Sequence, residues 1–220
     1  MVELIHNLRA ERVRANLERV RGEIAATGRD PSEVQILAAV KYVPVEELAA
    51  LADAGIVVVG ENRAQDLIAK ATAYPGRFTW DFIGHLQSRK VRQILPYVRY
   101  IHSVDSDSVL EQLRRHAPPQ TEVLVEVNVA GEAGKSGIAP SELPAYLERC
   151  EVKVVGLMTM PPLAPSPEDS RPHFAALREL ASEHGLAELS MGTSQDYLIA
   201  VQEGATIVRL GTSLYRSRAS

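Results

Sequence analysis

The stretch VQILAAVKYVPVEELAALADAGIVVVGE, residues 34–61, contains the unit from which the fold is built. It opens with a near-continuous apolar run at 34–41 and closes with a second one at 56–61. Between them, apolar residues recur at helical spacing until Gly55. Runs this short and this apolar are typical of strands that are buried on both faces. Two such strands joined by a helix form a βαβ unit with parallel strands.

The same alternation continues along the rest of the chain. Further short apolar runs lie at 79–84, 100–104, 122–128, 152–159, 188–192 and 207–212, with helix-like segments between them. Strands that alternate with helices through right-handed crossovers close into a barrel when the unit repeats eight times. We therefore predict an α/β fold, a single (β/α)8 TIM barrel that spans residues 1–220 as one domain. An open doubly wound sheet is the alternative.

Both ends of the chain depart from the repeat. An amphipathic, charged segment at residues 3–27 precedes the first strand, and only SLYRSRAS follows the eighth. We predict an extra N-terminal helix that covers the bottom of the barrel or the gap in its outer ring, and no helix after the last strand. The proline-rich stretch MPPLAPSPEDSRP, residues 160–172, is predicted to be a loop that can fold over a site at the barrel mouth.

Composition and charge exclude several classes of protein. The chain is 45% hydrophobic with a formal net charge of -4 and no basic stripe, so nucleic acid and membrane surfaces are poor partners. No apolar run approaches the about 18 residues of a membrane span, and the N-terminus lacks the apolar core of a signal peptide. The single cysteine, Cys150, excludes an internal disulfide. We expect a reduced, cytoplasmic, monomeric protein without a metal site.

Lys41 ends the first apolar run, where barrel enzymes carry their functional groups. Its stem is expected to lie among apolar neighbours, and such desolvation favours the neutral amine. A neutral amine can attack an aldehyde and form a Schiff base. The alternative is a lysine whose stem is buried and whose ammonium reaches solvent.

Glycines and hydroxyls follow the last two strands. Residues 192–194 (GTS) precede a helix that Ser194 is predicted to cap, and Gly211 and Thr212 follow the eighth strand. Free backbone N–H groups beside hydroxyls bind anions, and loops after strands seven and eight are the recurrent phosphate site of these barrels. Asp196, in the predicted first turn, would oppose a bound anion somewhat, but it can point outward. Each segment alone is also consistent with an ordinary turn.

Arg209 lies inside the last apolar run. A buried arginine requires partners. It could donate to an unprotonated ring nitrogen of a phosphorylated heteroaromatic ligand, or form a structural ion pair with Glu61 or Glu126.

Seven ordered stretches together resemble a known family, the YggS/PROSC-type pyridoxal phosphate homeostasis proteins. They are AVKYVPVEEL, VVGENRAQDL, WDFIGHLQSRKVR, IHSVDS, VEVNVAGEAGKSGI, GLMTMPP and LSMGTSQDYLIAVQEGATIVRLGTSLY. The resemblance implies a barrel like the N-terminal domain of alanine racemase, with pyridoxal 5′-phosphate held as a Schiff base on Lys41. Ser194, Gly211 and Thr212 would then hold the phosphate, and Arg209 would face the pyridine nitrogen. Strand-end positions Asn62, Met191 and Gly192 complete the predicted cofactor-binding set.

Three blocks depart from the family pattern. ENRAQD stands where the family has ENYVQE, so Arg63 replaces a tyrosine and any ring contact through that position is in doubt. LQSRK stands for LQSNK, and MGTS for MGMS. None of these changes removes Lys41, Ser194, Arg209 or Gly211.

The resemblance implies a cofactor carrier without catalytic turnover, which transiently contacts pyridoxal phosphate-dependent apo-enzymes. A racemase is the first alternative, but it needs a second base and a C-terminal β-domain, and this chain ends eight residues after the last run. Tyr42, Tyr197 and Tyr215 lie near strand ends, but nothing in the sequence positions any of them as that base. A Schiff-base aldolase is the second alternative. Lys135, in the glycine-bounded loop AGEAGKSG, could accept the cofactor during release.

Overall fold

A closed barrel of eight parallel strands forms the centre of the molecule. The computed structural model describes residues 4–216. Each strand pairs with its neighbours in sequence, and the last pairs with the first. This confirms the predicted barrel over the open sheet. The strands are β1 (Gln35–Ala39), β2 (Val58–Glu61), β3 (Thr79–Phe82), β4 (Val98–Val104), β5 (Glu122–Glu126), β6 (Lys153–Met158), β7 (Glu188–Thr193) and β8 (Ile207–Leu210).

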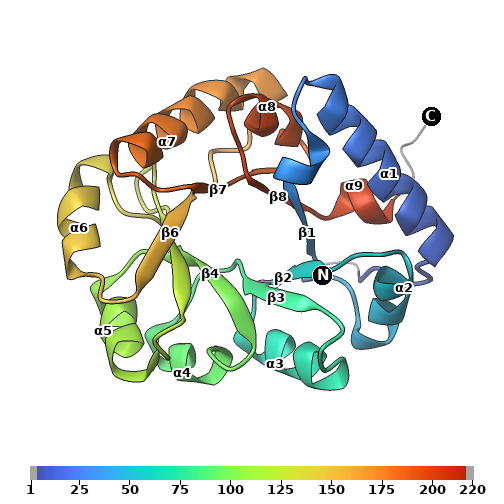
Figure 1. Ribbon diagram of the computed structural model, residues 1–220, viewed down its shortest axis with the longest axis horizontal. Coiled ribbons are helices and arrows are strands. Elements are labelled where there is room, and N and C mark those ends of the chain that lie inside the picture. Colours follow the sequence, from blue (N-terminus) through green and yellow to red (C-terminus); the bar gives the residue numbers. More distant parts are fainter. Residues whose placement is uncertain (1–3, 217–220) are drawn as a thin grey trace.

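Helices surround the barrel in an outer ring (Figure 1). They are α1 (Ala10–Ala26), α2 (Leu48–Asp53), α3 (Ala64–Ala73), α4 (Val91–Ile94), α5 (Asp107–His116), α6 (Leu143–Arg149), α7 (Arg171–Glu183), α8 (Tyr197–Gln202) and α9 (Thr212–Tyr215). Short 3-10 turns lie at Pro31–Glu33, Val45–Glu47, Ser88–Lys90, Pro140–Glu142 and Pro167–Ser170. In the part of the chain that the structure describes, no helix is both long and apolar enough to cross a membrane.

The two ends of the chain complete the ring. Helix α1 packs against α2, α8 and α9 and fills the outer ring between α8 and α2 (Figure 1). It begins at Ala10 rather than near residue 3, because the N–H groups of Asn7 and Leu8 donate to the Glu47 carboxylate, both at 2.8 Å. The prediction that no helix follows the last strand was wrong, since α9 adds one helical turn there.

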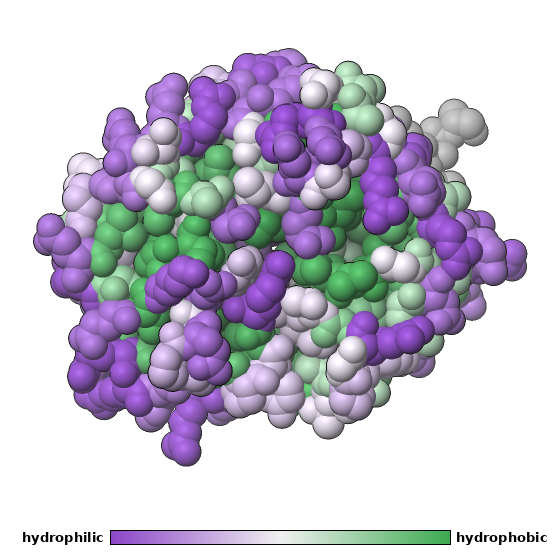
Figure 2. Space-filling model, in the orientation of Figure 1, coloured by the Kyte–Doolittle hydropathy of each residue, from purple (hydrophilic) through white to green (hydrophobic). Residues whose placement is uncertain are grey.

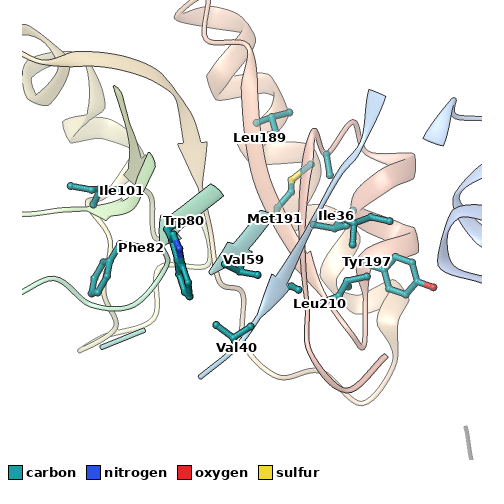
Figure 3. Close-up of a cluster of buried hydrophobic side chains, with 14 of the residues drawn as sticks. Ile36, Val40, Val59, Trp80, Phe82, Ile101, Leu189, Met191, Tyr197 and Leu210 are labelled. Carbon is teal, nitrogen blue, oxygen red and sulfur yellow. The ribbon is translucent and has the colours of Figure 1, made fainter. Parts of the chain in front are cut away.

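Side chains separate into an outer core and a barrel interior because they alternate along each strand. The outer core lies between strands and helices, and Figure 3 shows part of it, including Ile36, Val59 and Met191. The interior holds a small apolar cluster around Leu37 and Ile207. Farther along the barrel it becomes polar and holds the buried side chains of Asp81, His102, Ser190 and Arg209. Figure 2 shows hydrophilic side chains near the centre of the face in view, with apolar surface beside them.

Candidate functional site

A cavity of about 690 Å³ opens at the carboxyl ends of the strands. This volume is within the usual range of small-molecule sites. Its wall brings together three predicted residues, Asn62, Gly192 and Arg209, with Glu126 and Lys135. Residues 160–167 of the proline-rich stretch line one side of it, so the predicted loop does border the mouth. From Pro167 onward that stretch is helical.

Two backbone N–H groups converge on one hydroxyl beside this cavity. The N–H groups of Gly211 and Ser213 donate to Ser194 Oγ at 3.1 and 3.2 Å, and Ser213 Oγ donates to the Ser194 carbonyl at 3.3 Å. The loops after β7 and β8 therefore meet, as predicted. Both N–H groups point at a single oxygen position at hydrogen-bonding distance. A phosphate oxygen at that position could therefore replace Ser194 Oγ as the acceptor of both.

The first turn of α8 differs from its prediction. The N-cap is Asp196 and not Ser194, because α8 begins at Tyr197. Asp196 does not point away from the loop. Its Oδ1 accepts from the Thr193 N–H at 2.7 Å and from Thr193 Oγ1 at 3.0 Å, and its Oδ2 accepts from Ser170 Oγ at 3.1 Å. The carboxylate therefore ties the loop after β7 and contributes negative charge to the cavity wall.

Arg209 projects into the barrel interior and is held by neutral acceptors. Nη1 donates to the carbonyl and to Oγ of Ser190, both at 2.6 Å, and Nη2 donates to the Thr159 carbonyl at 2.8 Å. Burial lowers the pKa of Arg209 to about 10, so it remains a cation at neutral pH. Among residues 4–216, no carboxylate lies within ion-pair distance of it, and the ion pairs considered for it with Glu61 and Glu126 are not formed.

Glu61 has another partner, a lysine that the sequence did not single out. Lys70 of α3 is buried, and its Nζ lies 2.6 Å from Glu61 Oε2 and 2.7 Å from the carbonyl of Val40. Glu61 Oε1 accepts from the N–H of Asn62 at 2.7 Å. This buried pair therefore fixes the chain directly before Lys41 and at Asn62, two positions of the predicted site. A single lysine within an outer helix gives no sequence signal for such a role.

The predicted apolar environment of Lys41 was wrong. The residue is exposed, in the turn after β1, and its Nζ lies 4.8 Å from the centroid of the Tyr42 ring. Among residues 4–216, no carboxylate pairs with it. The end of β1 nevertheless lies beside the loop after β8, since Ala39 O is the nearest atom, at 3.9 Å, to a Cβ placed on Gly211. Lys41 is thus at the mouth, but in contact with solvent.

The remaining predicted residues lie in different surroundings. Asn62 lines the cavity, and its Oδ1 is buried without a hydrogen-bond partner. Gly192 has a φ of 88°, and a Cβ there would lie 2.6 Å from Ala200 Cβ. Met191 is fully buried in the outer core (Figure 3), so only its backbone could contact a ligand. Thr212 begins α9.

Glu126 is a feature of the cavity that sequence reasoning treated only as an ion-pair partner. Burial raises the pKa of its carboxyl from 4.5 to about 7, the charge of Asp105 adds to this effect, and Arg209 opposes it. Asp105 Oδ1 is buried without a partner, while its Oδ2 accepts from the Gly137 N–H at 3.1 Å. A carboxyl that titrates near neutral pH in a cavity is typical of functional sites. Its position near the end of the apolar run at 122–128 was the available signal.

Two further side chains, Lys135 and Met160, lie at the mouth. Lys135 lines the cavity, with its Nζ 3.9 Å from Glu132 Oε2. Met160, which is 55% exposed, places its sulfur 2.9 Å from Arg209 Nη2. Among the residues described, no group of three or more His, Cys, Asp and Glu side chains could hold a metal ion.

Comparisons with known proteins agree with this geometry. Residues 8–219 match the family model described as alanine racemase, N-terminal domain. The pyridoxal phosphate homeostasis protein of Aquifex aeolicus is 40% identical, over 94% of this chain and 97% of that protein. Its counterpart in Pseudomonas aeruginosa is 38% identical, over 95% of each chain. This chain belongs to the pyridoxal phosphate homeostasis protein family.

Membership in the pyridoxal phosphate homeostasis family extends to solved structures. PipY of Synechococcus elongatus, determined with pyridoxal phosphate bound, is 33% identical and superposes with a TM-score of 0.78. The match covers 93% of this chain and all of PipY. The resemblance inferred from the seven stretches is therefore confirmed.

Proposed function

We propose that this chain binds pyridoxal 5′-phosphate at the barrel mouth and holds it reversibly, as a cofactor carrier rather than a catalyst. The observation that carries the proposal is the convergence of the Gly211 and Ser213 N–H groups on Ser194 Oγ. This cradle lies beside the strand end that leads to Lys41 and at the same mouth as Arg209. A cradle for a phosphate, an amine and a cation for a ring nitrogen match the three polar ends of the cofactor.

Each residue has a separate task in this proposal. Ser194, Gly211 and Thr212 bind the phosphate, and Asn62 orients the ring through its unpartnered amide oxygen or its amide N–H, the two being interchangeable by a flip. Arg209 donates to the ring nitrogen. When bound, the cofactor supplies an aldehyde carbon that a lysine amine can attack, and Lys41 is the amine we assign to it. The exposure of Lys41 favours release of the cofactor to solvent or to acceptor proteins, as a carrier requires.

The tyrosines near the mouth support a carrier over a racemase. Tyr197 OH donates to Glu23, and Tyr215 OH donates to the carbonyl of Ala39 at 3.2 Å. Burial raises the pKa of both hydroxyls well above the ordinary value. A second base must be free to accept a proton on the opposite face of the ring, and neither hydroxyl is free. Tyr42 lies against the Lys41 ammonium instead.

Borohydride trapping tests the assignment. The purified chain is incubated with pyridoxal 5′-phosphate, reduced, digested and mapped by mass spectrometry. We expect one adduct on Lys41, absent in Lys41→Ala and retained in the control Lys135→Ala, which removes a lysine that lines the cavity. Pyridoxal without the phosphate should bind much more weakly. Modification spread evenly over exposed lysines, or equal binding of pyridoxal, would refute the site.

A second experiment separates the carrier from an enzyme. The loaded chain is incubated with L-alanine in deuterated water, and the D-enantiomer and α-deuterium are measured. We expect neither to accumulate beyond the level of free cofactor. Transfer to a pyridoxal phosphate-dependent apo-enzyme is followed by recovered activity of that acceptor. Slower transfer from Lys135→Ala would support Lys135 as the amine that accepts the cofactor during release, and unchanged transfer would exclude it.

A further inference from the structure

A continuous chain of polar side chains crosses the barrel interior beneath Arg209. Arg209 Nη1 lies 2.6 Å from Ser190 Oγ, which lies 2.8 Å from His102 Nδ1. His102 Nε2 is 3.1 Å from Asp81 Oδ2. Asp81 then accepts from Arg99, with Nε 3.0 Å from Oδ1 and Nη2 2.6 Å from Oδ2. The first four side chains are buried, whereas that of Arg99 is 31% exposed at the opposite, amino-terminal end of the barrel.

Arg209 and Asp81 set the direction of the hydrogen bonds that join them through Ser190 and His102. A guanidinium only donates, so Ser190 Oγ accepts from Arg209 and its own proton goes to His102 Nδ1. His102 is therefore bare at Nδ1 and protonated at Nε2, from which it donates to the carboxylate of Asp81. A cationic His102 would leave the Ser190 proton without an acceptor and would add a charge between two arginines.

The ionisation of the two central groups agrees with this arrangement. Burial lowers the pKa of His102, so the neutral ring is favoured. Burial would raise the pKa of Asp81, but hydrogen bonds from His102 and Arg99, together with the charge of Arg99, lower it overall. Asp81 is thus an anion, His102 is neutral, and each polar hydrogen between them has one acceptor.

We propose that Ser190, His102 and Asp81 are positioning residues for Arg209. Ser190 and the Thr159 carbonyl fix the plane of the guanidinium, and His102 fixes the hydroxyl of Ser190. Among residues 4–216 no carboxylate forms an ion pair with Arg209, and Asp81 lies two side chains away, so no direct ion pair neutralises the guanidinium. These hydrogen-bonded side chains therefore determine how strongly Arg209 donates to a ligand's ring nitrogen. This last step rests on the proposed function, whereas the proton arrangement does not.

The proton arrangement is tested without any cofactor. Imidazole ¹⁵N spectra report which ring nitrogen of His102 carries the proton, and the resonance is assigned through the backbone of β4. We expect a neutral ring protonated at Nε2 throughout about pH 6 to pH 8, the range in which an ordinary histidine titrates. Ser190→Ala should shift the Nδ1 resonance. The control Ser103→Ala removes a buried hydroxyl bonded to the Gly84 carbonyl and should leave His102 unchanged. A titrating ring, or one protonated at Nδ1, would overturn the proposal.

The effect on Arg209 is tested with pyridoxal 5′-phosphate bound. The midpoint of the pH titration of the bound cofactor's visible absorbance should move by about half a unit to one unit in Ser190→Ala, which corresponds to the net contribution of one hydrogen bond. Ser190→Cys is slightly larger than serine but is only a weak donor and acceptor, and should behave like alanine. Ser103→Ala should not move the midpoint. An unmoved midpoint in both Ser190 variants, with the expected ¹⁵N spectrum, would refute positioning. If wild type binds no cofactor, the proposed function fails, and with it the proposed effect of Ser190 on donation from Arg209 to the ligand. The ¹⁵N spectra still decide the proton arrangement.

Discussion

Replacement of Glu126 by glutamine should remove a large pH dependence of stability. Burial raises the pKa of this carboxyl from 4.5 to about 7 in the folded chain. Between these two pH values the folded state holds a proton that the unfolded state has lost, so the free energy of unfolding falls as pH rises. The full difference of about 2.5 pH units corresponds to about 3 kcal/mol. That contribution is present below pH 4.5 and is lost as pH rises through 7.

The assay is urea denaturation of wild type and Glu126→Gln at several pH values between about 5 and 8, where linear extrapolation yields the free energy of unfolding. The difference between the two proteins cancels all titrations that they share. We expect Glu126→Gln to gain stability relative to wild type as pH rises, by about 2 to 3 kcal/mol across this window. The exposed Glu46→Gln serves as the matched control and should follow wild type.

The cause of the shift can be tested in the same way. The charge of Asp105 is the second contribution to the raised pKa of Glu126, after burial. Asp105→Asn should therefore reduce the pH dependence without abolishing it. Parallel curves for wild type and Glu126→Gln would refute the reasoning, because they would mean that the carboxyl is ionised in both folded and unfolded chains over this range.

Two further predictions concern the elements that build the mouth. Gly192→Ala should lose more stability than Gly28→Ala in urea denaturation. Both glycines have a φ of 88°, which costs about 1–2 kcal/mol for alanine, but of the two only Gly192 would place the new Cβ within 4 Å of other atoms. Equal losses would contradict the steric argument. Lys70→Met should lower the free energy of unfolding by about 3–5 kcal/mol, because it leaves Glu61 buried and unpaired. The control Arg77→Ala breaks the exposed pair with Asp53 and should lower it by about 1 kcal/mol or less. Similar losses in the two variants would show that Glu61 is not buried as an anion.

Much of the fold could be predicted because burial on both faces leaves a local pattern. Each parallel strand reads as a short apolar run, and the eight runs coincide with β1 to β8 to within about two residues at most ends. The helix boundaries were less certain. Residues 4–9 carry apolar side chains at helical spacing, yet their backbone bonds to Glu47 instead, because a distant carboxylate competes for the N–H groups.

The ends of the apolar runs identify the residues that reach the barrel mouth. In a closed parallel barrel every strand ends at the same rim, so position at the end of a run brings Asn62, Gly192 and Gly211 to one side of the molecule. Whether a side chain turns inward or outward, and which side chains it meets across the interior, depends on strand register and closure. Only the tertiary structure therefore showed that Met191 faces the outer core and that Lys41 is in solvent. It alone joined Arg209 of β8 through β7 and β4 to Asp81 of β3. The strands β4 and β7 are not neighbours in the sheet, so Ser190 and His102 meet only across the interior of the closed barrel.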